Sequence, residues 1–295
     1  MLTRERFARM LDPYILKVYE NVVEKGDDYV GRIFSVQTSN LAEEKVTGIG
    51  AADLPQKWAG QVYYSDISPL WDKSFRHEKY SLGIKFEREL WEDAQHAEVK
   101  QRVNAAMLSI YRFRQLHAHW IFNNAFGECK TPDGQPLCST AHPLSPDNPA
   151  TQGNKGTKDL NLDALEETRI AMLNFTDDKG KKLLIVPDLL VVPPSLEVKA
   201  RELVESSGRP DTADRVDNVR KGAYNVLTLP LLESSGSWFL VDSKLMKQYC
   251  LWFDRRKATP ERDEDFDTEV IKYKAVCRFS YGVINWTWCY GHQVA

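Results

Sequence analysis

The sequence has little of what secreted, membrane-spanning or disulfide-stabilised proteins carry. No apolar run approaches the roughly 20 residues that a membrane-spanning helix needs, and the charged N-terminal stretch MLTRERFARMLDPYILKVYE has no apolar signal core. The five cysteines are an odd number, lie far apart and form no CxxC pair. We therefore expect reduced thiols in a protein made in a cytoplasm, with no standard secretion signal and no membrane span.

An excess of charge of one sign is also missing. The chain has 39 Lys and Arg against 42 Asp and Glu, a net charge of −3. A protein that grips nucleic acid by neutralising phosphates usually has a strongly basic face. The two short basic clusters, Arg255–Lys257 and Lys179–Lys182, lie close to acidic residues and are interpreted as solvated loops. The charge balance argues against a sequence-specific nucleic-acid binder.

The motifs of common enzyme classes are absent too. There is no GxSxG, P-loop, GxGxxG or HExxH motif. His117 and His119 are two residues apart on a predicted helix, whereas ligands that share a helix face are three or four apart. Cys138 and His142, with Cys129 upstream, lack a fourth zinc ligand at close spacing. We predict no catalytic, cofactor-binding or metal-binding residues, and a metal-dependent hydrolase that uses Cys138 and His142 is the remote alternative.

The first third of the chain predicts elements that need a partner surface. Apolar residues over 7–22 recur at three- and four-residue intervals and predict a helix. The glycine-rich stretch 47–60 reads as a flexible approach to a hairpin of strands at 61–64 and 74–90, with turn chemistry at 66–72. A hairpin alone is marginally stable in water, so this one is expected to rest on another surface.

A long helix is the next predicted element. Glu92 and Asp93 place negative charge at its N-terminus, where the helix dipole favours it. Apolar residues then step by three or four from Val99 to about Phe126, and Gly127 is the natural stop. At about 1.5 Å per residue the helix would be roughly 50 Å long, which suits an elongated molecule better than a small compact domain.

Shorter helices and strands alternate through the rest of the chain. We predict a loop at 127–160, a helix at 162–175, buried strand segments at 183–186 and 189–192, a helix at 195–206, a polar loop at 207–222, strands at 224–232 and 238–241, a solvated charged turn at 261–269 and aromatic strands over 269–290. Helices and strands are mixed without a regular βαβ alternation.

Five stretches, in this order, carry a resemblance to a known family. They are QVYYSDISPLWDKSFRHEKYSLGIKFERELWED (61–93), GQPLCSTAHP (134–143), PDLLVVPPSLEVKA (187–200), SWFLVD (237–242) and YKAVCRFSYGVINW (273–286). Together they resemble the tailed-bacteriophage major capsid proteins, most closely the Mu-like major head subunit family. Cys138 stands where that family usually has Phe. The likeness covers the chain from about Lys57 onward.

The resemblance implies an α+β capsid fold with five parts. These would be an N-terminal arm (1–50), an extended loop (51–90), a peripheral domain with a long spine helix (91–160), an axial domain (161–266) and return strands of the peripheral domain (267–295). It also implies pentamers and hexamers of this chain in an icosahedral shell. The N-terminal arm is short for a built-in scaffold, so a separate scaffolding protein or none is expected.

The resemblance also suggests contacts between subunits. The expected contact residues are Trp58, Tyr63, Ile67, Leu70, Trp71 and Phe75 in the extended loop, and Arg209, Asp214, Arg215 and Arg220 in the polar loop near the capsomer axis. Portal and head-decoration proteins are further expected partners. The shell would enclose double-stranded DNA without reading its sequence, in a virion assembled from subunits made in the host cytoplasm. An encapsulin, a nanocompartment shell of the same fold, is the nearest alternative.

Overall fold

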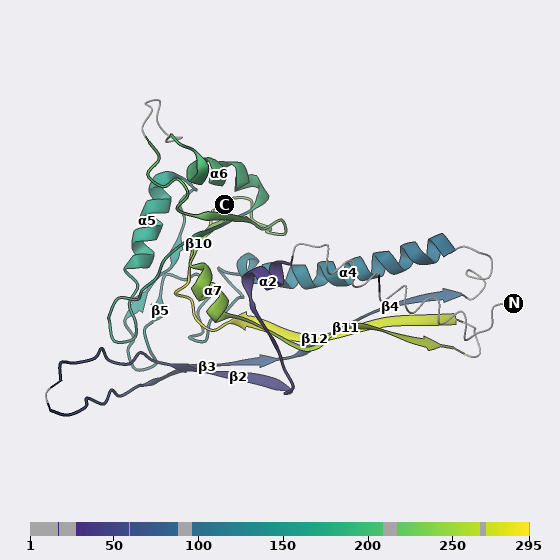
Figure 1. Ribbon diagram of the computed structural model, residues 1–295, viewed down its shortest axis with the longest axis horizontal. Helices are drawn as coiled ribbons and strands as arrows, with labels where there is room; N and C mark the ends of the chain where they lie inside the picture. The colour runs from purple at the N-terminus through teal and green to yellow at the C-terminus, as the bar shows by residue number, and fades with distance from the viewer. Residues whose placement is uncertain are drawn as a thin grey trace.

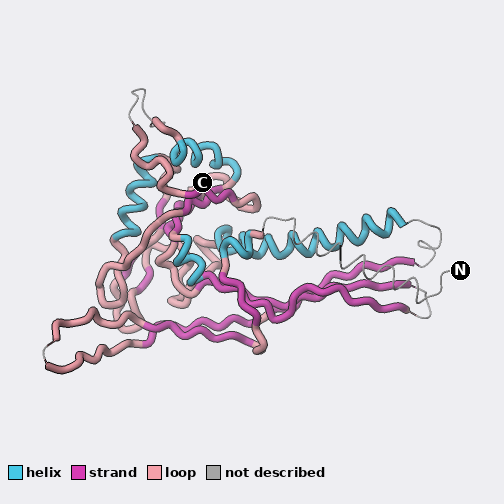
Figure 2. The backbone as a smooth tube through the Cα atoms, viewed as in Figure 1, coloured by secondary structure: helices cyan, strands magenta, loops and turns pink. Residues whose placement is uncertain are grey.

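The elements form a long arm, a rounded lobe at one end of it and a hairpin that projects near their junction (Figures 1 and 2). The computed structural model describes residues 17, 28–58, 60–87, 96–208, 217–265 and 270–294. Except for Lys17, the helix predicted over 7–22 therefore lies outside the described residues. Helices and separate, largely antiparallel sheets occur together, which confirms the predicted α+β class.

The arm is built on a four-stranded sheet in the order β1-β11-β12-β4. Its strands are β1 (Ser35–Thr38), β4 (Glu78–Glu87), β11 (Cys250–Glu264) and β12 (Val270–Val283). The three long strands pair antiparallel, and β1 runs parallel to the start of β11. Side chains alternate between the faces of a strand. On β12, aromatic residues such as Phe279 and Tyr281 face the helix of the arm, whereas Arg278 and Gly282 face away from it.

The predicted long helix is present as α4 (His96–Asn123), which lies along one face of this sheet (Figure 1). Its 28 residues make it about 42 Å long. The Phe113 ring packs edge-on against Tyr80 of β4, with centroids 4.8 Å apart. The Arg114 guanidinium binds both oxygens of the buried Asp254 carboxylate at 2.9 and 2.8 Å. Aromatic packing and this bidentate ion pair attach the helix to the sheet.

The lobe contains a five-stranded sheet in the order β7-β13-β10-β8-β9. Its strands are β7 (Lys155–Gly156), β8 (Leu189–Val192), β9 (Asn225–Thr228), β10 (Trp238–Val241) and β13 (Cys289–His292). The surrounding elements are β5 (His142–Pro143), β6 (Thr151–Gln152), α5 (Leu162–Leu173), η1 (Pro194–Leu196), α6 (Glu197–Glu205) and α7 (Ser243–Tyr249). The predicted helices at 162–175 and 195–206 and the strands at 189–192 and 238–241 are confirmed. Every residue of β10 is buried, which explains its continuous apolar run.

The predicted hairpin is wrong in its strands. The observed hairpin pairs β2 (Glu43–Ile49) with β3 (Pro69–Arg76), and the loop 50–68 joins them. Residues 61–64 have no strand pairing, and β4 pairs with β12 instead. β2 was missed because its charged side chains on an exposed ribbon leave a weak apolar alternation, whereas the aromatic QVYY run imitates a strand. Pro69 is tolerated because it is the first residue of its strand.

Three further predictions are corrected. The basic cluster at 255–257 and the acidic run from Glu261 were interpreted as solvated loops, but residues up to Glu264 belong to β11 and pair with β12. Residues 183–186 are not a strand, and Leu184 is 93% exposed. In β11, charged side chains are accommodated because the distal part of the arm has a solvent-facing side.

Strand pairing also changes the expected division into parts. β11 falls inside the expected axial segment 161–266 but pairs in the sheet of the arm. β13 falls in the expected return strands 267–295 but pairs in the sheet of the lobe. Within the expected N-terminal arm 1–50, β1 is part of the long sheet and β2 part of the hairpin. These exchanges arise because non-local pairing, which sequence patterns do not encode, decides which sheet a strand joins.

Candidate functional site

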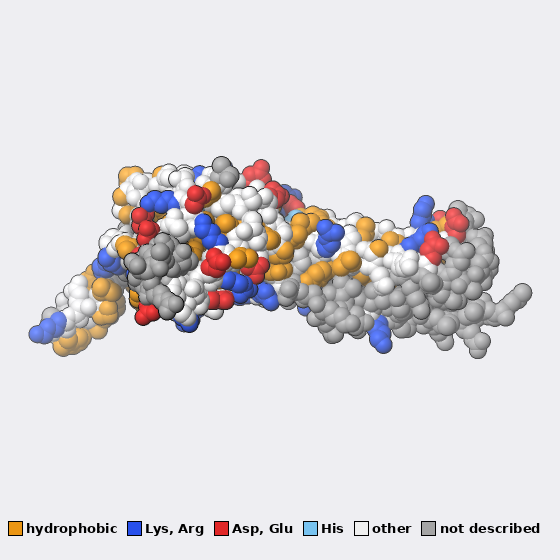
Figure 3. Space-filling view, turned by 90° about the horizontal axis from the view of Figure 1, so that it is seen from above, with side chains coloured by type: hydrophobic (Ala, Val, Ile, Leu, Met, Phe, Trp, Pro, Cys, Tyr) orange, Lys and Arg blue, Asp and Glu red, His pale blue; other side chains and the backbone are white. Residues whose placement is uncertain are grey.

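The hairpin carries the densest group of exposed apolar side chains among the described residues. They are Ile49, Leu54, Trp58, Val62, Tyr63, Tyr64 and Ile67, between 47% and 85% exposed. Figure 3 shows hydrophobic side chains along the hairpin where it projects at the left of the molecule. Contiguous apolar surface of this kind on a soluble protein marks an interaction site, because leaving it in water is unfavourable.

The loop of the hairpin is held in shape at its base by Asp53. This carboxylate accepts hydrogen bonds from Tyr63 Oη at 2.9 Å and Ser65 Oγ at 3.1 Å. Lys179, in a turn of the lobe, places Nζ 3.0 Å from Asp53 Oδ1. These contacts, led by the one to Lys179, lower the pKa of Asp53 to about 2. The loop is therefore fixed both internally and to the lobe.

A second contact between lobe and hairpin comes from Asp178. Its Oδ1 accepts a hydrogen bond from the Ala51 amide at 2.9 Å. Gly50 is required beside it, because a Cβ there would lie 2.6 Å from the Asp178 carboxylate and 2.9 Å from the Ser68 carbonyl. Sequence reasoning missed these contacts. The available signal was a glycine next to a strand, which indicates a close backbone approach without naming the partner.

The structure places the expected contact residues of the loop in three different settings. Trp58, Tyr63 and Ile67 are exposed on the hairpin, at 69%, 50% and 47%. Leu70 and Trp71 are half-buried and line a hollow of about 390 Å³ between the hairpin base and the lobe.

Phe75 does not belong with these surface residues. It is 3% exposed and packs inside its own chain, with its ring centroid 5.2 Å from that of Phe253. Leu251 belongs to the same small buried cluster. The packing within the subunit does not support Phe75 as a contact between subunits, because β3 turns this side chain onto the long sheet, and that role stays a prediction.

The expected contacts of the polar loop are only partly described. Arg209, Asp214 and Arg215 lie outside the described residues. Arg220 forms an ion pair within the chain, with Nη2 2.7 Å from Glu166 Oε2 on α5. This guanidinium already has a carboxylate partner in its own subunit, so any pairing with a neighbour would have to compete with Glu166.

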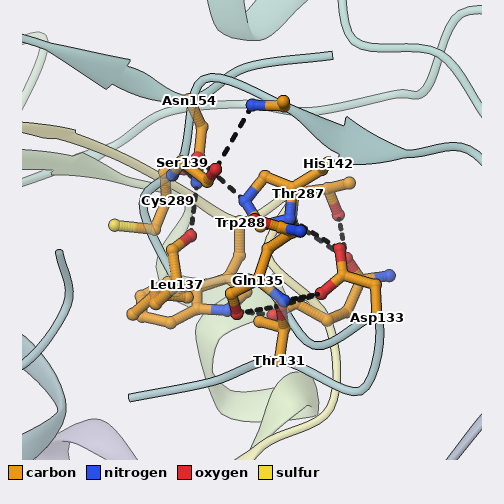
Figure 4. A network of polar contacts seen from close by, with 12 residues as sticks. Thr131, Asp133, Gln135, Leu137, Ser139, His142, Asn154, Thr287, Trp288 and Cys289 are labelled. Atoms are coloured by element: carbon orange, nitrogen blue, oxygen red, sulfur yellow. Dashed lines mark hydrogen bonds and ion pairs between the residues drawn. The ribbon is translucent and has the colours of Figure 1, made fainter. Parts of the chain in front are cut away.

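The segment GQPLCSTAHP (134–143) is organised around a buried histidine, His142 (Figure 4). His142 Nδ1 lies 2.6 Å from Asp133 Oδ2, and His142 Nε2 lies 3.2 Å from Asn154 Oδ1. The Trp286 ring stacks on the imidazole at 4.5 Å with an interplanar angle of 11°. The expected plain loop at 127–160 is thus ordered in part by a polar centre, beside apolar residues such as Leu137 that belong to the main core.

The orientation of Asn154 follows from its other hydrogen bonds (Figure 4). Its Nδ2 donates to the carbonyls of Leu137 at 2.8 Å and Cys289 at 2.9 Å. Its Oδ1 accepts from the Ser139 amide at 2.9 Å and therefore presents an acceptor to His142 as well. Both ring nitrogens of His142 face oxygen acceptors. The network joins the segment to β13 and fixes its position against the sheet of the lobe.

Asp133 is held in its charged form by the same network. Burial alone would raise its pKa, but hydrogen bonds from His142 and Thr131 and from the Gln135 amide outweigh burial, so the pKa lies below its ordinary value. Sequence reasoning did not pair Asp133 with His142. The available signal was the Asp-Gly pair at 133–134, which is typical of a turn, and Gly134 adopts a positive φ of 83°.

The remaining histidines and cysteines that the sequence singled out have packing roles. His117 Nδ1 lies 2.8 Å from Tyr281 Oη, and His119 Nδ1 lies 2.7 Å from the Gln115 carbonyl. Cys129 is a buried free thiol whose pKa burial raises to about 12. Within the described ranges, no three His, Cys, Asp or Glu side chains gather closely enough to hold a metal ion. No helix in the described part of the chain is long and apolar enough to span a bilayer.

Comparison with solved structures shows what fold this is. The chain is similar to the capsid of bacteriophage JBD30 decorated with minor capsid protein trimers (TM-score 0.57, 17% identity, 72% of this chain and 93% of that chain). It is also similar to a structure from Mycobacterium phage Patience (TM-score 0.57, 10% identity, 100% of this chain and 90% of that chain). A structure from Microbacterium phage Oxtober96 is similar as well (TM-score 0.54, 11% identity, 92% of this chain and 92% of that chain). At these identities the likeness shows a shared tailed-phage capsid fold. Comparison with curated protein sequences gives no match.

The sequence itself matches a family described as phage capsid protein over residues 72–291, well over half of the chain. The match confirms the resemblance to tailed-phage capsid proteins, while the narrower Mu-like assignment stays a prediction. The arm, the lobe and the apolar hairpin are thus parts of a shell subunit with a structural and not a catalytic role. The chain belongs to the phage capsid protein family.

Proposed function

We propose that this major capsid protein closes its shell by laying the hairpin of each copy over a neighbouring copy, in pentamers and hexamers. The observation that carries the proposal is the row of exposed apolar side chains on the loop 50–68. Fully burying one large apolar side chain contributes about 1.5–3 kcal/mol. Several such side chains on every copy are enough to drive association once a complementary surface is offered.

The geometry of the hairpin supports this role. The loop is anchored at its base by Asp53 and Asp178 contacts to the lobe, yet its apolar side chains point into solvent. A loop that is already ordered loses less conformational entropy when it binds than a flexible one. The hollow beside Leu70 and Trp71 would take an apolar group from a neighbour.

The shell is proposed to enclose double-stranded DNA without reading its sequence. A net charge of −3 provides no large excess of cations to hold phosphates. Scaffolding, portal and head-decoration proteins are the proposed partners, and synthesis in the host cytoplasm precedes assembly. The structure of the JBD30 capsid, one of the similar proteins, is decorated with minor capsid protein trimers. Shell contents separate this proposal from the encapsulin alternative, because an encapsulin would hold a cargo enzyme instead of DNA.

The hairpin contact is tested by shortening the loop. Residues 53–66 are replaced by a short Gly/Ser link that leaves the pairing of β2 with β3 intact. The subunit should keep its far-UV circular dichroism but form no shells in electron micrographs. Normal shells from this variant would show that the hairpin is not an assembly element.

A milder pair of variants controls for the loss of surface hydrophobicity in general. Trp58→Ser with Tyr64→Ser removes two side chains that are 69% and 85% exposed on the hairpin. Leu184→Ser with Val186→Ser removes two that are 93% and 62% exposed elsewhere. Assembly yield should fall for the first pair and not for the second. Equal yields would contradict the proposal.

A further inference from the structure

Three cations stand opposite one another across three neighbouring strands of the arm. Lys79 of β4 is the Cα partner of Arg278 on β12, and Arg278 is the Cα partner of Arg256 on β11. Directly opposed side chains on a sheet have Cβ atoms about 4.5–5.5 Å apart, and like charges in such positions destabilise the pairing. This row of like charges does not stabilise the fold of the single subunit.

A fourth cation joins the row through an irregularity in β11. The register of β11 against β12 shifts between Asp254 and Arg256 and again between Arg256 and Thr259. Such bulges change the direction of side chains, and here Arg255 lies beside Lys79, Arg256 and Arg278. The four cations and Val276 line a hollow of about 390 Å³. The hollow lies on the face of the sheet opposite α4, the face that β3 covers nearer the lobe.

The chain neutralises this hollow only in part. Arg256 forms an ion pair with Glu261, which also lies 3.5 Å from Lys274 Nζ. Among the described residues, Lys79, Arg255 and Arg278 form no ion pair. The remaining positive charge affects the pKa of the neighbouring His77. Burial mainly lowers the pKa of His77, and Arg278 and Arg255 lower it further.

We propose that this cationic hollow, formed by Lys79, Arg255, Arg256 and Arg278, binds an acidic segment of a second copy of this chain. Guanidinium groups bind carboxylates with short, strong hydrogen bonds, so two or more Asp or Glu side chains would fill it. A shell brings many copies of this chain into contact, so a second copy is a ready source of such carboxylates. Outside these four cations the chain is more acidic than its net charge of −3 indicates, so its other surfaces can supply the carboxylates.

Duplex DNA fits the hollow less well. DNA binding depends on many phosphates contacted along an extended basic surface. Here the basic area is compact, and acidic side chains follow directly along β11 at Glu261 and Asp263. A small anionic patch on a protein matches this size and charge better. The inference rests on the shell-forming role of the chain but not on the proposed hairpin contact.

Substitution of Lys79 and Arg255, the two cations of the hollow that neither pair with a carboxylate nor bond to the backbone within the described residues, tests the proposal. The variant Lys79→Gln with Arg255→Gln is compared with Lys85→Gln and Arg112→Gln, which remove two exposed cations from the same face of β4 and from α4. Unassembled subunits of the first variant should melt at the same or a higher temperature than the parent, because repulsion is relieved. Assembled shells of that variant should melt several degrees lower than parent or control shells at low salt, where charges are least screened.

The outcomes separate this proposal from the role of the hairpin. Shells should still form in the Lys79/Arg255 variant, whereas loss of the hairpin should prevent assembly. Equal melting of variant and control shells would overturn the proposal. So would a variant that keeps its shell stability but loses bound duplex DNA, because the hollow would then be a phosphate site.

A direct measurement uses the parent protein and does not depend on a variant that folds. Shells are assembled from a mixture of unlabelled and ¹⁵N-labelled subunits and treated with a carbodiimide, which joins an amine to a carboxylate in contact with it. Mass spectrometry should find Lys79 joined to an Asp or Glu of a differently labelled copy. Links confined to a single copy, or no links at Lys79, would overturn the proposal.

Discussion

Lys179 binds Asp53 across the junction of lobe and hairpin, with Nζ 3.0 Å from Oδ1. Lys179 Nζ also donates to the Asp66 carbonyl at 3.0 Å, so one lysine contacts both sides of the loop. Lys179 lies in the turn between Asp177 and Lys181, whose backbone bonds hold it in place. The hairpin is thereby positioned before any neighbour arrives, which favours orderly assembly over random association.

Removal of this ion pair should loosen the hairpin without unfolding the subunit. In Asp53→Asn, the loop 50–68 should be cut faster by trypsin at Lys57, because the loop loses its charged contact to Lys179. Asp66→Asn is the matched control, since only the backbone carbonyl of Asp66 contacts Lys179. The pKa of Asp53 is about 2, below its ordinary value, so the contact is complete at neutral pH and is lost as pH falls through about 2. Equal cleavage of both variants would contradict this role.

The Asp133–His142 pair should be among the most sensitive points of the subunit. Asp133→Asn removes a buried carboxylate that is bonded to Thr131, the Gln135 amide and His142, and leaving buried hydrogen-bonding groups unsatisfied typically costs about 1–3 kcal/mol of the free energy of unfolding. Urea unfolding measures the loss, and Asp147→Asn on the exposed part of the same loop is the control. Because the pKa of Asp133 is lowered, its stabilising effect is present above the ordinary carboxyl value and disappears as pH falls through the folded value. A loss under about 1 kcal/mol would show that the pair is dispensable.

Mild acid should destabilise the lobe through His292. The ring stacks on Trp238 at 4.1 Å, accepts a hydrogen bond from the Lys158 amide at 3.0 Å, and lies 2.8 Å from Thr168 Oγ1. Burial, with a smaller effect of the Lys158 charge, lowers the pKa of His292 to about 4. Between pH 6.5 and about 4 the unfolded chain binds a proton that the folded chain does not, so the free energy of unfolding falls as pH falls.

The variant His292→Gln isolates this effect. Unfolding in urea at about pH 7 and about pH 5 should show a smaller loss of stability on acidification than in the parent, because one titrating group is gone. Burial also lowers the pKa of His117 and His119, which would account for the slope that remains. Equal losses in parent and variant would show that His292 does not titrate in this range.

Local periodicity was enough to predict the elements with one strongly apolar pattern. α4 has its core residues at helical spacing over many turns, and β10 is a short apolar run in which all four residues are buried. β11 was missed because its distal half carries charges that suit a solvent-facing sheet as well as a loop. A charged segment such as this one becomes a strand because a neighbouring strand pairs with it, and its local sequence does not reveal that pairing.

Long-range contacts were beyond sequence reasoning for a similar reason. Asp53 and Lys179 are far apart in the chain, and no local spacing relates them. The aromatic residues of the extended loop were predicted as contacts because the resemblance places that loop over a neighbouring subunit. Phe75 looked the same in sequence, yet β3 directs it onto Phe253. Only the three-dimensional pairing of strands separates the buried residue from the exposed ones.

Electron microscopy of the purified protein, alone and with its scaffolding protein, tests the central claim most directly. The apolar hairpin and the family membership predict closed shells of uniform size built from pentamers and hexamers. Light scattering on the same samples should show assembly that increases with protein concentration. Protein that stays monomeric across salt and concentration, with or without the scaffold, would contradict the account.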